Sequence, residues 1–398
     1  MIATGILPSL VQAEETSGIN LKPLTIHPLL KIKYGFDSNV FHASSDFPAN
    51  SEYPRSATSS GYLDLVSELG LELQFSNWLF LNNFRVHFID YQNSHASQQS
   101  TTGYPEFSGD HMLKWKSPAQ GLNIEAEEKW KVTSDPMLQD YLVWQWQRVK
   151  RLNNELGGTF AYTSRSGFWL EKLKYSWERD QYLQSLFRQM NYGVHTLTLQ
   201  GENHLLPETS LALALRYRNV YWDQIEYGQE RNSNDLNLSA SFNGRVSEKL
   251  SSILGLGYEV DLFRNGDFEG TPVGVLKLIW KPRETMEFTF LGQREVRPST
   301  TSQSYYNNVF QVSSRFQNLW PRGLEFGANF QWEWDQYQKI DARNEIIYHV
   351  HAETLYKFAG VLKWLKLGAE YNFDLAQNDI PFYPYHEHQV NLILEASY

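Results

Sequence analysis

Two histidines and a glutamate at alternate positions come nearest to a metal-binding pattern in this chain. His349, His351 and Glu353 lie in a run of alternating apolar and polar residues. Alternate side chains of an extended strand point to one face, and imidazole and carboxylate groups can ligate a metal ion. Two histidines with no further ligand to complete the set are more often polar residues of a strand face. We therefore expect no metal site and no cofactor here.

Other signatures of catalysis do not occur in the sequence. The chain has no Cys, which excludes disulfides, thiolate metal sites and thiol catalysis. It contains no glycine-rich phosphate loop and no nucleophile elbow. No Asp–His or Ser–His pair of a hydrolase can be assembled from the residue pattern. The sequence predicts a protein that is not an enzyme.

Charge and composition narrow the class of protein. The chain of 398 residues carries 35 Lys and Arg against 45 Asp and Glu, a net charge of -10. This balance argues against a nucleic-acid partner, because such proteins carry a basic surface. Aromatic residues make up 15% of the chain, yet the mean hydropathy is negative. Many rings in a polar chain are typical of a transmembrane β-barrel, whose aromatic residues lie at the membrane interfaces around a polar lumen.

Alternation of apolar and polar residues runs through most of the chain from Leu30 onward. Residues 324–335, for example, alternate almost without a break. A membrane-crossing strand needs about 9 to 11 residues, and the segments here are at least of that order. The expected strands are 30–37, 60–75, 78–93, 105–116, 120–133, 151–164, 167–182, 190–204, 208–224, 232–247, 250–263, 268–281, 284–297, 305–318, 322–338, 344–357, 362–375 and 386–398. This pattern predicts an all-β fold, an antiparallel up-and-down transmembrane barrel of about eighteen strands.

Short and long connections alternate between these segments. The short connections carry the Pro, Gly, Ser and Asn of hairpin turns, as at Phe75–Trp78. Barrels with short periplasmic turns and longer external loops show this alternation, and an even strand number places both termini in the periplasm. Residues 134–150, with Trp144 and Trp146, form either an inward-folded loop that narrows the pore or an extra strand pair. The even count favours the loop.

The two ends of the chain have distinct patterns. Residues 1–13 form a short apolar stretch that ends in V-Q-A before Glu14, which is typical of a signal peptide, although no Lys or Arg precedes it. We expect export, with a periplasmic segment at 14–29 and the barrel at 30–398. The last segment places Val390, Leu392 and Leu394 on one face and ends on Tyr398. It resembles the closing strand of bacterial outer-membrane barrels, and this resemblance implies that Tyr398 is a signal for the outer-membrane assembly machinery.

A short string at the end of the first expected strand carries a second resemblance. Gly35-Phe36-Asp37-Ser38-Asn39-Val40-Phe41 is similar to the G-[YF]-D-S-N-[VI] string of a family of outer-membrane β-barrel porins of Gram-negative bacteria. Some members of that family are associated with exopolysaccharide export. The resemblance implies an outer-membrane location and a role with polysaccharide. By residue type alone, Asp37 and Asn39 are suited to cap backbone groups where strand meets loop.

The polar faces of the expected strands supply candidate pore-lining residues. These are Lys31, Lys33, Arg85, Lys129, Lys131, Arg216, Arg218, Glu259, Asp261, Glu287, Glu325, Glu333, Asp335, Glu353, Glu370 and Asp374. The acids dominate the second half of the chain, so we expect one acidic wall facing a mixed wall. Charges that line a pore tune its selectivity. The prediction is a porin-like channel for small hydrophilic solutes with mild cation preference, embedded in outer-membrane lipid. Alternatives are a conduit for exopolysaccharide, a barrel enzyme and an adhesive or structural barrel.

Overall fold

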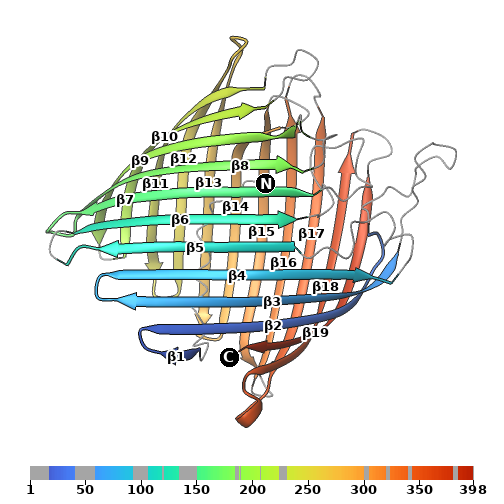
Figure 1. Cartoon of the computed structure of the whole chain (residues 1–398). Helices are drawn as coiled ribbons and strands as arrows, with labels where there is room; N and C mark the ends of the chain where they lie inside the picture. Colours follow the sequence, from blue (N-terminus) through green and yellow to red (C-terminus); the bar gives the residue numbers. More distant parts are fainter. Residues whose placement is uncertain are drawn as a thin grey trace.

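The computed structural model describes residues 18–40, 59–92, 106–118, 121–133, 150–183, 188, 190–206, 208–223, 231–299, 304–319, 323–338, 343–379 and 384–397. These residues form one antiparallel sheet that closes on itself as a barrel (Figure 1). Each strand pairs with its neighbours in the chain, and β19 returns to pair with β2. The eighteen wall strands run from β2 to β19, so the expected up-and-down barrel is confirmed.

The strand bounds agree with the expected segments to within a few residues at most ends. The strands are β1 (Ile19–Leu21), β2 (Leu24–Asp37), β3 (Ser60–Phe75), β4 (Trp78–Tyr91), β5 (Glu106–Lys116), β6 (Leu122–Thr133), β7 (Arg151–Thr163), β8 (Trp169–Tyr182), β9 (Tyr192–Leu206), β10 (Thr209–Trp222), β11 (Ser233–Ser247), β12 (Leu250–Phe263), β13 (Phe268–Arg283), β14 (Met286–Pro298), β15 (Ser304–Leu319), β16 (Leu324–Tyr337), β17 (Asn344–Lys357), β18 (Leu365–Asn378) and β19 (Tyr385–Ser397). A 3-10 turn, η3 (Gly360–Leu362), lies between β17 and β18. Residues 134–149 and Tyr398 lie outside the described residues.

The first wall strand is longer than its alternation predicts. β2 begins at Leu24, and β1 folds back on it as a short hairpin. Pro28 pairs with Leu69 of β3, but the pairing with β19 ends at Leu29. Pro28 therefore lies at an edge, where its missing N–H removes no bond from a central ladder. Residues 24–29, expected to form a separate segment, continue the barrel wall.

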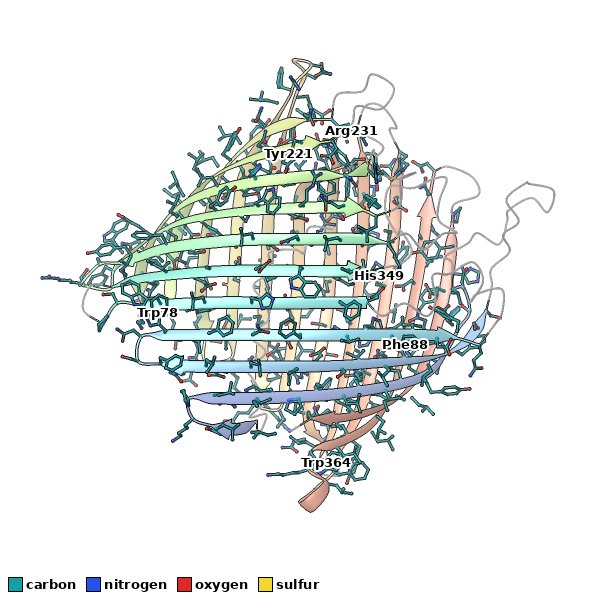
Figure 2. The ribbon with its side chains drawn as sticks, viewed as in Figure 1. Trp78, Phe88, Tyr221, Arg231, His349 and Trp364 are labelled. Atoms are coloured by element: carbon teal, nitrogen blue, oxygen red, sulfur yellow. The ribbon has the colours of Figure 1, made fainter. Side chains whose placement is uncertain are left out.

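The outward face of the barrel is apolar and carries aromatic residues at both ends. Leu213, Leu256 and Leu392 are each more than 60% exposed. Figure 2 shows Trp78 and Trp364 near the end with the short turns, and Phe88 and Tyr221 toward the opposite, loop end. Exposed apolar surface on this scale in a soluble protein would cause association. Lipid contact between two aromatic girdles explains it.

No helix in the described part of the chain has the length and apolar character needed to cross a membrane.

One junction of the barrel wall is incompletely paired. β13 and β14 pair from Gly274 with Arg294 down to the hairpin. Above that point residues 268–273 pair only with β12, and residues 295–298 pair only with β15. We call this gap between 268–273 and 295–298 the seam. Pro272 lies in it and has no N–H to offer a neighbouring strand.

Side chains bridge the seam from both faces of the wall. From the outside, Arg294 donates to the Pro272 carbonyl and to Thr271 Oγ1, each at 3.1 Å. From the lumen, Arg218 of β10 donates to the carbonyl of Val296 at 3.2 Å. Guanidinium donors thus replace part of the missing backbone ladder.

Candidate functional site

The inner face of the barrel holds the charged residues that the sequence singled out. Cross-strand register places Lys33 beside Asp64, Arg85 beside Glu68, and so on around the wall. Since side chains opposite one another lie on the same face of the sheet, the candidate pore-lining residues all share the face opposite the exposed leucines.

Closure of the barrel brings bases of the first strand against acids of the last strands. Lys31 Nζ lies 3.7 Å from Glu353, and Lys33 Nζ lies 2.9 Å from Glu370. Both pairs form across β19 and join β2 to β17 or β18. The simple division into an acidic wall and an opposite mixed wall therefore needs revision. Lys31 and Lys33 of the first wall strand offset part of the charge of the acidic wall itself.

A second group of ion pairs lies toward the loop end of β10, β11 and β12. Arg216 lies 2.6 Å from Glu259, and Arg218 lies 2.6 Å from Asp235 and 3.0 Å from Glu259. Asn237 also donates to Glu259. Arg218 and its two carboxylate partners are buried. Asp261, opposite Asp235 in the register, is buried beside them.

A third group lies on β14, β15 and β16. Arg297 pairs with Glu295 at 2.5 Å and lies 3.7 Å from Glu333. The amide of Asn307, fully buried, donates to Glu333 and to Asp335. One base and one amide thus hold three carboxylates together. This part of the wall keeps an excess of negative charge.

Most of the remaining candidates also have a charged partner on the inner face. The partners are Arg85 with Glu68, Lys129 with Glu127, Lys281 with Glu287, Lys366 with Glu325, and His349 with Asp374. Lys131 lies beside Ser108 and Asn153 in the register. His351 contacts Asn372 Oδ1 at 2.7 Å. His349 and His351 are therefore each engaged with a different polar partner on β18.

A cluster around His87 was missed by the sequence reasoning. Its Nε2 lies 2.8 Å from Asp64, and its Nδ1 lies 3.2 Å from Glu106. Thr133 Oγ1 donates to the other oxygen of Glu106 at 2.9 Å. The available signal was the position of His87 two residues after Arg85, on the same polar face. The cluster ties β3, β4, β5 and β6 together at the loop end.

An aromatic collar at the loop end of the lumen was also missed. Its members are inward-facing rings near the loop ends of their strands, and each is less than 10% exposed: Tyr62, Tyr91, Tyr182, Tyr192, Trp222, Phe263, Tyr305, Tyr337 and Tyr385. Neighbouring rings pack in pairs, with centroids 4.8 Å apart for Tyr305 and Tyr337 and also for Tyr192 and Trp222. We call this set the collar. It stiffens the external mouth because neighbouring strands share packed rings there.

A recess of about 370 Å³ opens in the inner wall over β10 to β14. Small residues make room for it, among them Ser239, Ser241, Gly255 and Gly257. Its rim carries charges of both signs, including Arg216 and Glu259. Small side chains on one wall of a lumen leave space that a polar solute can enter.

Comparison with known proteins identifies the architecture. No protein-family model matches the chain, and no curated protein matches its sequence. A BenF-like porin from Pseudomonas fluorescens Pf-5 superimposes with a TM-score of 0.53, at 12% identity over 95% of this chain and 100% of that chain. OccAB3 of Acinetobacter baumannii gives 0.50, at 11% identity over 94% and 99%. OccK9 (OpdG) of Pseudomonas aeruginosa gives 0.50, at 10% identity over 94% and 98%.

At these identities the likeness is one of fold, and it extends over nearly the whole of each chain. A closed barrel with an apolar outer face is one of the two kinds of structure that can span a lipid bilayer, the other being the α-helix. The chain is a bacterial outer-membrane β-barrel. Its short turns therefore face the periplasm and its loop end faces the exterior, since outer-membrane barrels are inserted in that orientation.

Proposed function

We propose that this outer-membrane barrel is a channel for the passive passage of small hydrophilic solutes, with a mild preference for cations. The observation that carries the proposal is the inner face, on which carboxylates outnumber Lys and Arg among the described strands. The fold shared with solved porins supports the passage of solutes. The charge excess supports the preference.

The preference for cations follows from the charged side chains of the inner face that remain in excess once the ion pairs are taken into account. The bases Lys31, Lys33, Arg216, Arg218 and Arg297 each have a carboxylate partner. Several acids share one base or are held by amides, as in the group around Asn307. The wall therefore keeps net negative potential, which raises the local concentration of cations and lowers that of anions.

Planar-bilayer recording of the purified protein tests both parts. A channel gives conductance steps, and a KCl gradient gives a reversal potential whose sign reports K⁺ over Cl⁻. Blocking of the current by neutral sugars of increasing size reports the pore width. Absence of conductance from a correctly folded barrel contradicts the channel. A reversal potential of anionic sign contradicts the preference alone.

A conduit for exopolysaccharide is the second candidate, and the collar is the observation that bears on it. Aromatic rings bind sugars when their faces are free, but the collar rings are buried, and three pairs of them pack ring against ring. Asp37 and Asn39 of the family-like string cap the strand end instead. The Asn39 amide N–H donates to Asp37 Oδ1 at 2.7 Å, and its side chain donates to the His386 carbonyl at 3.0 Å. Both features favour small solutes over a polymer, and the sugar series distinguishes the two functions.

A further inference from the structure

Three carboxylates of two neighbouring strands meet at the loop end of the inner wall. They belong to Asp235 of β11 and to Glu259 and Asp261 of β12. One oxygen of each lies within 4.8 Å of those of the other two, and all three side chains are buried. Asp235 is directly opposite Asp261 in the register, and like charges in that position destabilise a sheet. A compensating interaction is needed.

Two arginines neutralise part of this negative charge, and their hydrogen bonds go to Asp235 and Glu259. Arg218 donates to Asp235 Oδ2 at 2.6 Å and to Glu259 Oε1 at 3.0 Å. Arg216 donates to Glu259 Oε2 at 2.6 Å. Both oxygens of Glu259 and one oxygen of Asp235 are thus engaged.

Asp261 receives none of these bonds. It is 3% exposed, and within the described ranges no hydrogen-bond donor reaches its Oδ1 or the Oδ1 of Asp235. Glu269 of β13 is opposite Asp261 on its other side, which adds a fourth carboxylate to the row. A buried carboxylate oxygen without a partner carries the full cost of its desolvation. The orphaned oxygens point to a ligand that supplies positive charge.

We propose that Asp235, Glu259 and Asp261 form a binding site for a divalent cation, with calcium as the ion that fits best. Hard cations take oxygen ligands, and Ca²⁺ binds them at about 2.3 to 2.6 Å in irregular geometry. Two oxygens on one Ca²⁺ are therefore at most roughly 5 Å apart, which accommodates the spread of the three ligand atoms. Mg²⁺ is smaller and requires a near-ideal octahedron, which two arginine-bound carboxylates do not offer.

The site would also stabilise the wall beside the seam. Arg218, which holds two of the three carboxylates, donates to the Val296 carbonyl on β14. An ion on Asp235 and Asp261 therefore joins β11 and β12 and fixes the carboxylates that hold Arg218 in place. Calcium binding is expected to raise the resistance of the barrel to unfolding, because a ligand that binds only the folded state stabilises it.

The test uses the full chain, purified in detergent and treated with EDTA. Calcium chloride is titrated by calorimetry, and thermal unfolding is followed by heat-modifiable migration at each concentration. The wild type is expected to show saturable heat and a saturable rise in unfolding temperature. Asp261→Asn, which keeps the shape and removes the charge, is expected to weaken binding at least tenfold. Asp235→Asn gives an independent second variant, and Asp374→Asn is the matched control that keeps wild-type binding.

The outcomes distinguish a calcium site from three carboxylates that only repel one another or are protonated. Binding by the wild type and Asp374→Asn, with loss in both site variants, supports the proposal. Absence of heat and of a temperature shift in the wild type overturns it. Equal calcium affinity in Asp261→Asn and the wild type also overturns it, because the ion is then bound elsewhere. None of these measurements depends on conduction, so the proposed channel function can fail or hold separately.

Discussion

Lys33 of the first wall strand and Glu370 of the seventeenth form an ion pair that spans the closing strand between them. Lys33 Nζ lies 2.9 Å from both oxygens of Glu370. From the closing strand, Asn391 donates to the same carboxylate at 3.1 Å, and Tyr62 of β3 donates to Asn391 at 2.6 Å. Four strands thus meet in one hydrogen-bonded network. The network fixes the register in which the barrel closes.

Removing the base alone should destabilise the barrel more than removing the pair. Glu370 is 6% exposed, and Lys33→Met leaves its charge buried without a cation, which costs about 3 to 5 kcal/mol. The double variant Lys33→Met with Glu370→Gln removes that unpaired charge and should recover part of the loss. Thermal unfolding in detergent measures both. Lys22→Met, at an exposed position, is the control, and equal losses in the single and double variants contradict the argument.

Adjacent residues of the closing strand should differ in the cost of truncation. Ile393 faces inward and is 1% exposed, whereas Leu392 faces outward and is 64% exposed. Ile393→Ala leaves a cavity against Lys33 and Gly368 and should cost about 2 to 5 kcal/mol. Leu392→Ala leaves no cavity, because detergent or lipid fills the space, so its cost should be smaller. The free energies of unfolding of the two variants, measured side by side, decide the point.

The strands, and the face on which each of their side chains lies, were predictable because apolar and polar residues alternate along the sequence with a period of two. Ile393 is an apolar residue at a position where the alternation of its strand calls for a polar one, and only the closed barrel shows that it is buried opposite Lys33 and Gly368. The pairing of Lys33 with Glu370 was not predictable, since it depends on the stagger with which the first and last strands meet. The collar was hidden for a related reason. One inward ring per strand end carries no periodic signal until the strands are aligned.

Opposite charge changes at one ion pair should shift ion selectivity in opposite directions. Lys31 and Glu353 are 21% and 27% exposed and lie 3.7 Å apart, so both contribute to the potential of the lumen. Glu353→Gln should lower the K⁺ over Cl⁻ preference, and Lys31→Met should raise it. Reversal potentials across a KCl gradient measure this. The shifts should shrink at high salt, because screening shortens the Debye length to about 3 Å at 1 M. Shifts of the same sign in both variants would count against lumen control of selectivity.

Deleting Tyr398 should impair assembly more than conduction. The residue lies outside the described part of the chain, but β19 reaches Ser397 and pairs on both sides, with β18 and β2. The resemblance to outer-membrane closing strands implies recognition of the terminal aromatic by the assembly machinery. The expected result is a lower amount of heat-modifiable barrel in the membrane, with unchanged single-channel conductance in the fraction that folds. Normal amounts of folded protein in the membrane would contradict a role of Tyr398 in assembly.

The backbone amide hydrogens of the seam should exchange with solvent faster than those of any fully paired pair of strands at the same level of the barrel wall. Residues 268–273 and 295–298 form no ladder hydrogen bonds with each other. By contrast, β11 and β12 are paired continuously past Asp235 and Asp261. Arg294→Met removes the donors to Pro272 and Thr271, and a bond from a charged donor contributes about 1.5 to 3 kcal/mol. Exchange at the seam should therefore quicken by roughly tenfold or more, since about 1.4 kcal/mol corresponds to one factor of ten. Hydrogen exchange read by mass spectrometry measures it, with peptides of β11 and β12 as the internal reference.

Arg245→Met, whose partners lie at the turn end, is the matched control and should leave the seam unchanged. Uniform acceleration across all strands would show that Arg294 stabilises the whole barrel and not the seam.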